Sequence, residues 1–196
     1  MLVGNGCGAD VLEAVRAAGF RRVAAGPFCD PATVAQLCEV GVGSRVTIHL
    51  GNKSGWIPCS SKGSDCRSRL PLQLEGVVRA VVEDGKFKVT GPIFTGQIAD
   101  MGKCVLFEIE NDIELIISSE RMEPYDVQTH TIPGVNIPRK DFLLLKSRMY
   151  CRPVFGPLSQ GLVECDSDHG GPTSSNYANF SFKHIRKTVY PLYNNE

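Results

Sequence analysis

The order of hydrophobic and polar residues over the first fifty positions predicts helices that alternate with short strands. Apolar side chains recur at helical spacing over Ala9–Ala18, which predicts an amphipathic helix. The apolar run Arg22–Phe28 is typical of a buried strand, and the alternating run Arg45–Leu50 is typical of a half-buried one. Between them, Asp30-Pro31 predicts the start of a second helix, because Asp is a natural N-cap and Pro fits the first helical position. This rhythm favours a parallel sheet with crossover helices.

From residue 70 onward the pattern changes to apolar runs of strand length that are separated by turn residues. The dipeptide Asp84-Gly85 predicts a hairpin between the runs on either side of it, and Asn111-Asp112 predicts a second hairpin. The strands predicted in this part are Leu70–Val82, Lys86–Thr90, Cys104–Glu110, Ile113–Ser118, Phe142–Lys146 and Gly161–Asp166. We therefore expect an α/β protein whose βαβ-like N-terminal part continues into a mixed, largely antiparallel β-rich part.

The organisation along the chain indicates a single domain over residues 1–196. Residues 1–50 are its α/β part, residues 51–69 are a long loop rich in Gly, Ser, Lys and Cys, and residues 70–196 are its β-rich part. The glycine-rich stretch Gly4–Gly8 is expected to form a tight turn, because its third glycine comes one residue too early for a dinucleotide-binding fingerprint. The segment Tyr177–Glu196 is expected to wrap around the domain surface.

Composition and charge narrow the classes of function. Lys plus Arg and Asp plus Glu both total 21, so the net charge is zero, and an electrostatic nucleic-acid binder is not expected. No membrane role is expected either, because no apolar run approaches the roughly 20 residues that span a bilayer. The sequence starts without a signal peptide, so a cytoplasmic location with reduced thiols is expected.

The cysteines and histidines do not form a recognisable metal motif. None of the 8 cysteines has the C-x-x-C spacing of a zinc or redox site, and no H-E-x-x-H pattern occurs among the 4 histidines. The segment Asp166–Gly171 contains possible ligands, including His169, but its composition is that of an ordinary turn. No G-x-S-x-G elbow supports a serine nucleophile. We therefore expect no metal bound by this chain, and its catalytic residues stay unassigned.

Charged and small polar residues gather at three strand ends, where a rigid sheet presents side chains to a ligand. An arginine in such a place is able to clamp a carboxylate in a bidentate way. The residues that we select as candidates for substrate binding are Asp100, Arg121, Lys146, Ser147 and Arg152. The alternative roles are structural. Asp100 would then lie in a turn that starts a strand, and Arg121 would pair with Asp126 to hold its loop. Lys146 and Arg152 would form salt bridges.

Several short motifs follow one another along the chain. They are Asp30-Pro31 followed by Gly41-Val42-Gly43, then Gly51-Asn52-Lys53-Ser54-Gly55, Gly91-Pro92 with Asp100-Met101-Gly102, Ser118-Ser119 with Arg121 and Asp126, and Lys146-Ser147 with Arg152. Their order and spacing resemble the C-terminal domain of the microcystinase C (MlrC) family, over nearly the whole chain. The chain departs from the family pattern at Tyr150, where the family often has His, and at Gly4–Gly8, where the family has a longer turn.

The resemblance implies a zinc metallopeptidase-like protein, and some members of that family open linear microcystin peptides. It also implies that the zinc ligands and catalytic residues belong to an N-terminal metal-binding domain, which is missing here or carried by a partner chain. Under this hypothesis the chain is the C-terminal domain, contributes to the cleft for a peptide-like substrate, binds no cofactor itself and is inactive alone. The alternative hypothesis is a stand-alone binding or scaffold module without catalysis.

Overall fold

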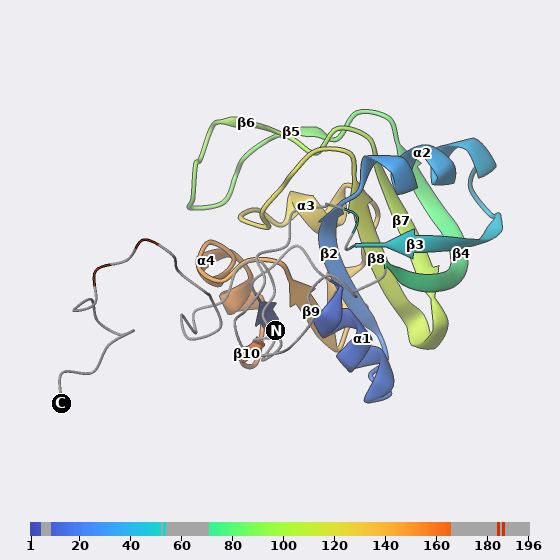
Figure 1. The fold of residues 1–196 in the computed structure, drawn as a ribbon. Coiled ribbons are helices and arrows are strands. Elements are labelled where there is room, and N and C mark those ends of the chain that lie inside the picture. The colour runs from blue at the N-terminus through green and yellow to red at the C-terminus, as the bar shows by residue number, and fades with distance from the viewer. Residues whose placement is uncertain (5–8, 52, 54–70, 166–183, 185, 187–196) are drawn as a thin grey trace.

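An eight-stranded sheet forms the centre of the molecule, as the computed structural model in Figure 1 shows. The structure describes residues 1–4, 9–51, 53, 71–165, 184 and 186. The order of strands is β10-β1-β9-β2-β8-β7-β4-β3, and β5 and β6 form a separate two-stranded sheet. The strands are β1 (Leu2–Gly4), β2 (Val23–Cys29), β3 (Arg45–Leu50), β4 (Leu72–Val82), β5 (Lys86–Lys88), β6 (Ile98–Asp100), β7 (Cys104–Ile109), β8 (Ile113–Ser118), β9 (Phe142–Leu145) and β10 (Val163–Cys165). The helices are α1 (Asp10–Ala17), α2 (Pro31–Val40), α3 (Gln128–Thr131) and α4 (Arg152–Phe155), with 3-10 turns η2 (Glu110–Asp112), η3 (Ile137–Arg139) and η4 (Gly156–Leu158).

The large sheet has a parallel half and an antiparallel half, which confirms the α/β class. Strands β10, β1, β9, β2 and β8 run parallel to one another. Strands β7, β4 and β3 follow in antiparallel succession. The predicted parallel crossover from β2 through α2 to β3 is wrong, because β3 lies at the far end of the sheet and pairs antiparallel with β4. A parallel crossover runs instead from β1 through α1 to β2, and its first strand was not among the predicted elements. The parallel half takes strands from early and late parts of the chain, so the change of pattern near residue 50 does not separate the two halves.

Local sequence explains where the two longest helices begin and end. The Asp30 side chain caps α2, because its Oδ1 accepts a hydrogen bond from the Thr33 N–H at 3.1 Å, and Pro31 is the first helical residue. Helix α1 ends just before Gly19, whose φ of 73° lies in the left-handed region that glycine adopts without strain. Both predicted helices are thus confirmed, with ends that differ by at most one residue for α1.

One of the two predicted hairpins is correct. Strands β7 and β8 pair across Asn111 and Asp112, whose φ angles of 63° and 57° suit a tight turn between twisted strands. The hairpin predicted around Asp84-Gly85 is wrong, because β5 pairs with β6 and not with β4. Both sides of β4 are already occupied by β3 and β7, so the chain after Gly85 forms its backbone hydrogen bonds with Gly102 and β6 instead.

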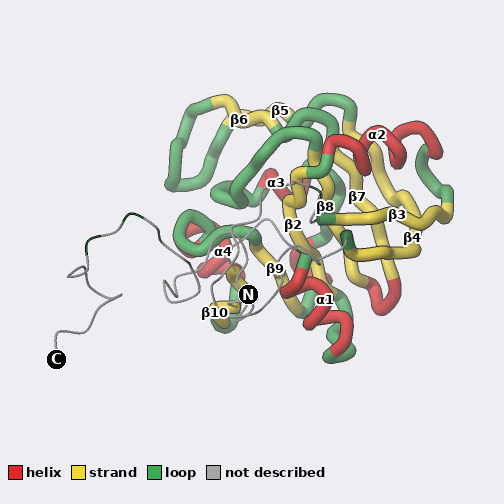
Figure 2. The backbone as a smooth tube through the Cα atoms, viewed as in Figure 1, coloured by secondary structure: helices red, strands yellow, loops and turns green. Residues whose placement is uncertain are grey.

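Alternating side chains of the sheet build two separate hydrophobic cores. On β2, Val23 and Ala25 face a cluster that includes Leu12 of α1 and Leu37 of α2. Ala24, between them, faces a second cluster. That second cluster contains Val154 and Phe155 of α4 and is bordered by Val127 just before α3. Because successive strand residues point to opposite faces, the sheet is covered on both, and the helices lie around a central layer of strands (Figure 2).

Several sequence predictions concern residues outside the described part of the chain. These are the turn over Gly4–Gly8 beyond its first residue, most of the 51–69 loop, and the turn over Asp166–Gly171. The segment Tyr177–Glu196, which was expected to wrap around the domain surface, is described only at His184 and Arg186. Among the described residues, no helix combines the length and apolar character that a membrane crossing requires.

Candidate functional site

Parallel pairing brings the carboxyl ends of β2, β8 and β9 to one edge of the sheet. Cys29 at the end of β2 lies opposite Ser118 at the end of β8. On the other side of β2, Gly26 lies opposite Leu145, the last residue of β9. Ligands of open α/β sheets commonly bind outside the carboxyl ends of the strands. We call the residues that follow these three strands, Cys29–Asp30, Ser118–Arg121 and Lys146–Ser147, the C-terminal edge.

Two of the predicted substrate-binding cations, Arg121 and Lys146, meet on this edge around Cys29. The Lys146 Nζ lies 4.7 Å from the centroid of the Phe28 ring, close enough for a cation–π contact. Arg121 is exposed, and it forms no hydrogen bond or ion pair with any other described residue. Both cations lie close enough to the Cys29 thiol to oppose the rise in its pKa that burial causes. Lys146 approaches from β9's side of β2 and Arg121 from β8's side. The edge therefore presents two positive groups from neighbouring strands.

Cys29 itself is not an activated nucleophile. Partial burial raises the pKa of its thiol above the ordinary value, and this outweighs the opposing effect of Arg121 and Lys146. Glu120, which is exposed on the same edge, raises the pKa further. Since the thiolate is the reactive form of cysteine, this thiol stays protonated at neutral pH.

Ser147 joins the loop after β9 to the loop after β8. Its side chain is buried, with 4% of the residue exposed, and its Oγ donates a hydrogen bond of 2.5 Å to Glu123 Oε1. The same Oγ accepts a hydrogen bond from the Cys151 N–H at 3.2 Å. The structure thus places Ser147 beneath the edge, where it fixes the loop of Arg121 relative to Lys146.

Lys53 is a residue of this edge that the selection of candidates missed. Its Nζ lies 2.7 Å from Asp30 Oδ2 and donates a hydrogen bond of 2.6 Å to Thr33 Oγ1. Asp30 is 5% exposed, so the ion pair neutralises a buried carboxylate at the start of α2. The signal was present in the sequence, because Lys53 lies in the Gly-rich motif Gly51–Gly55 that carries part of the resemblance.

Asp100 and Arg152 lie away from the pair of cations. Asp100 ends β6, and its Oδ1 accepts a hydrogen bond of 2.7 Å from the Gly102 N–H. It approaches the edge through its neighbour Met101, whose carbonyl accepts a hydrogen bond from the Glu120 N–H. Arg152 begins α4 and forms an ion pair with Glu164 of β10, which lowers the pKa of that carboxyl. The structure thus gathers Arg121, Lys146 and Ser147 and leaves these two on neighbouring elements.

The alternative pairing of Arg121 with Asp126 does not form. Asp126 is fully buried, and its carboxylate accepts hydrogen bonds of 2.7 Å from the N–H groups of Thr90 and Gly91. A third bond of 2.9 Å comes from the Gln128 N–H. Burial alone would raise the pKa of Asp126, but these three hydrogen bonds lower it below the ordinary value. Asp126 therefore holds the loops by backbone contacts and leaves Arg121 to solvent.

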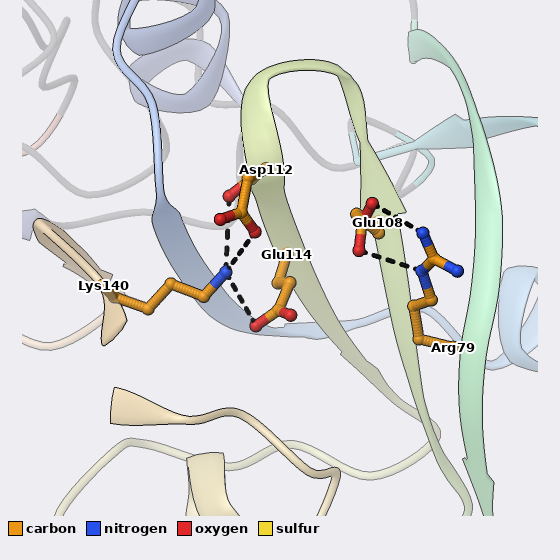
Figure 3. Close-up of polar contacts among 5 residues, drawn as sticks. All are labelled: Arg79, Glu108, Asp112, Glu114 and Lys140. Carbon is orange, nitrogen blue, oxygen red and sulfur yellow. Dashed lines mark hydrogen bonds and ion pairs between the residues drawn. The ribbon is translucent and has the colours of Figure 1, made fainter. Parts of the chain in front are cut away.

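The opposite edge of the parallel half carries a cluster of carboxylates, at the start of β8 and the end of β7. Glu108, Asp112 and Glu114 bring carboxylate oxygens within 4.8 Å of one another. Figure 3 shows the ion pairs that two cations, Lys140 and Arg79, form with these carboxylates. Lys140 Nζ lies 2.6 Å from Asp112 Oδ1 and 3.1 Å from Glu114 Oε2, and Arg79 binds both oxygens of Glu108. The carboxylates are therefore the anionic half of salt bridges.

These residues do not fit a zinc ion. Protein zinc sites are built from Cys and His ligands with an occasional carboxylate, and this cluster has neither Cys nor His. His130 is fully buried, its Nδ1 lies 2.9 Å from Thr129 Oγ1, and burial lowers its pKa to about 3. No other group of three metal-ligating side chains occurs among the described residues. This part of the chain therefore offers no zinc site.

Comparisons with known proteins agree with the fold described above. A family model described as MlrC C-terminus matches residues 4–184. The fold is similar to that in the crystal structure of a "putative metallopeptidase" from Mesorhizobium sp. BNC1, with a TM-score of 0.75 and 19% sequence identity. The match covers 100% of this chain and 38% of that one, so the chain spans well under half the length of the solved protein. A search of curated proteins found no match.

Proposed function

The chain belongs to the MlrC C-terminal family, and we propose that it forms one wall of the substrate cleft of a metallopeptidase. In this role the C-terminal edge binds a carboxylate of a peptide-like substrate. The zinc ion and the catalytic base would come from a different domain, on the same polypeptide or on a partner chain, and the present chain would be inactive alone. The observation that carries the proposal is the exposed Arg121, which has no hydrogen-bond or ion-pair partner among the described residues.

The arrangement of charges supports carboxylate binding at this edge. Arg121 supplies a planar fork of donors that matches a carboxylate in a bidentate way, and Lys146 supplies a second positive charge from the neighbouring side of β2. Asp30 does not compete for them, because Lys53 already neutralises it. Glu120 is the carboxylate of this edge that opposes an anionic ligand.

The other selected residues take indirect roles in this proposal. Ser147 positions Lys146 and the loop of Arg121 through its bond to Glu123. Arg152 fixes α4 to β10 through Glu164, and Asp100 shapes the Gly102 turn beside Glu120. Substrate contact is thus assigned to Arg121 and Lys146, and support to Ser147, Arg152 and Asp100.

Two features support a metal centre outside this chain. The described residues contain no group suited to zinc, and the similar protein described as a "putative metallopeptidase" is much longer, since this chain matches 38% of it. We expect the purified chain to retain less than one zinc per molecule after dialysis and to leave peptides uncleaved. Stoichiometric zinc by mass spectrometry together with peptide hydrolysis would contradict this division of labour.

Carboxylate binding is tested by titrating the chain with the peptide N-acetyl-Glu-Ala-amide and following backbone amide signals by NMR. Replacing Arg121→Gln should weaken binding about tenfold, because one charge-assisted contact is lost. Replacing Glu120→Gln should strengthen it, since an opposing charge disappears. The matched control is Arg22→Gln, an exposed arginine paired with Asp141 on the opposite edge, which should leave the affinity unchanged. Equal affinities of the chain and its Arg121→Gln variant would refute the role of Arg121.

The second candidate function is a stand-alone binding module without catalysis. The absence of a zinc-binding group among the described residues is compatible with it. The two functions differ in one measurable respect, which is recovery of activity with a second protein. Peptide hydrolysis that appears only when the chain is mixed with a zinc-binding domain of the same family would favour the cleft-wall function. Carboxylate binding without any such recovery would favour the binding module.

A further inference from the structure

Three aromatic side chains meet beside the C-terminal edge. The Phe94 ring packs against the Tyr125 ring with centroids 5.2 Å apart and an angle of 77°, and against the Tyr150 ring at 5.8 Å and 75°. Each ring comes from a different loop: Phe94 lies between β5 and β6, Tyr125 follows β8, and Tyr150 follows β9. These elements lie on the same side of the molecule, where the β5–β6 segment lies above α3 and α4 in the view of Figure 1. We call the three rings the aromatic cluster.

The aromatic cluster is open to solvent although it is apolar. Phe94 and Tyr150 are each 43% exposed, and Met149, next to Tyr150 in sequence, is 70% exposed. Contiguous exposed apolar side chains mark interaction sites more often than scattered ones do. Phe94 also has a φ of 58°, which is unusual for a bulky residue. Strained residues of this kind gather at sites that hold ligands, so the exposed ring is kept in place at a conformational cost.

The cluster is tied to the two cations of the C-terminal edge. Glu123 and Ser147, joined by their hydrogen bond, lie between the cations and the rings in both loops. Tyr125 is four residues after Arg121, and Tyr150 is four residues after Lys146. Four residues of fully extended chain span at most about 14 Å, so the Cα atoms of each cation and of the ring that follows it lie within a length that a short peptide spans.

We propose that Phe94, Tyr125 and Tyr150 bind the aromatic side chain of a peptide whose neighbouring carboxylate lies against Arg121 and Lys146. The choice of ligand follows from charge and shape together, because an aromatic surface borders positive groups that a carboxylate complements. This inference rests on the proposed function, since it names the class of peptide that the same cleft wall would accept. It predicts a preference for an acidic residue next to an aromatic one.

The preference is tested with two probes, N-acetyl-Glu-Phe-amide and N-acetyl-Glu-Ala-amide, titrated into the full chain and followed by NMR. The chain should bind the phenylalanine peptide about five- to tenfold more tightly, as expected for a ring that packs on other rings. The variants Phe94→Ala and Tyr150→Ala should remove this difference without changing the affinity for the alanine peptide. Tyr150→Phe, which keeps the ring, should preserve it. Val42→Ala, which shortens an exposed apolar residue at 63% exposure between α2 and β3, is the matched control.

Each possible result decides between the aromatic cluster and the wider proposal. Equal affinity for both peptides would overturn the aromatic subsite and leave carboxylate binding by the edge intact. No binding of either peptide would overturn the proposed function and this inference with it. If Phe94→Ala changed the sedimentation behaviour of the chain but not its peptide affinity, the rings would contact a second protein copy, and the subsite would be refuted.

Discussion

The two edges of the parallel half pair their charged residues differently. On the opposite edge, Lys140 is almost buried between Asp112 and Glu114, and Arg22 is 2.6 Å from Asp141. On the C-terminal edge, Arg121 is exposed and has no ion-pair partner among the described residues, while its loop is held by the neutral Ser147 and by backbone bonds to Asp126. The ion pairs of the opposite edge stabilise the fold. Arg121, whose loop is held by other contacts, is able to bind a ligand.

The largest expected change in stability concerns the opposite edge, where the charged residues are paired with one another. Replacing Lys140→Met removes a cation of which 4% of the side chain is exposed and leaves Glu114, whose side chain is 15% exposed, without its partner. Burial already raises the pKa of Glu114, and Lys140 opposes that rise. We expect the free energy of unfolding to fall by about 3 kcal/mol, because a buried charge loses its counter-ion.

Urea titration measures the free energy of unfolding of Lys140→Met, with Arg121→Met as the matched control on the C-terminal edge. The control should change stability by less than about 0.5 kcal/mol, as is usual for an exposed residue. Equal losses for the two variants would abolish the distinction between the edges.

A smaller change in stability is expected at the C-terminal edge, where backbone N–H groups bind the Asp126 carboxylate and hold the loops. Replacing Asp126→Asn should lower the free energy of unfolding by about 2 kcal/mol at pH 7, because three N–H donors lose a charged acceptor. The folded-state pKa of Asp126 is below its unfolded value, so this stabilisation is complete above pH about 3.9 and is lost as pH falls through the folded pKa. The difference in the free energy of unfolding between the wild type and Asp126→Asn should therefore become smaller in acid.

Urea titrations at pH 7 and in strong acid check this prediction, with the exposed Glu75→Gln as control. If this difference in the free energy of unfolding stayed constant or increased on acidification, the charge of Asp126 would not be what holds these loops.

The smallest expected effect concerns the connection between the two cations. Replacing Ser147→Ala removes the bond to Glu123 and should cost about 1 kcal/mol of stability. It should also weaken binding of N-acetyl-Glu-Ala-amide about threefold, although Ser147 is buried, because Arg121 and Lys146 lose their fixed spacing. The control Ser159→Ala removes a comparable hydroxyl bond to the Phe155 carbonyl and should leave the affinity unchanged. A loss of stability with no change in affinity would restrict Ser147 to a structural role.

Local patterns predicted most of the elements but not their neighbours in the sheet. The Asp30 cap, the helix stop at Gly19 and the turn at Asn111 depend on residues close in sequence, and these predictions are confirmed. The pairing of β5 with β6 depends on β3 and β7 having occupied both sides of β4, which no local pattern records. The family resemblance was nevertheless readable, because the order of several short motifs is preserved over the length that the family model matches.

The candidate site shows the same division between local and long-range information. Arg121, Lys146 and Ser147 were selected because they follow strands, and parallel pairing with β2 brings them to one edge. Lys53 and Glu123 were missed, since their partners Asp30 and Ser147 are more than twenty residues away in sequence. The aromatic cluster was missed for the same reason, because its three rings come from three loops.

The most direct test of carboxylate binding at the C-terminal edge is to map where a peptide with a carboxylate side chain binds. Backbone amide signals of the chain would be assigned and followed by NMR while N-acetyl-Glu-Ala-amide is added. The account predicts the largest shifts at Cys29, at Ser119–Arg121 and at Lys146, with signals of Arg22, Asp112 and Lys140 unchanged. Shifts that concentrate at Arg22 and Lys140, or no shifts at either edge, would contradict the claim that the C-terminal edge is the binding surface.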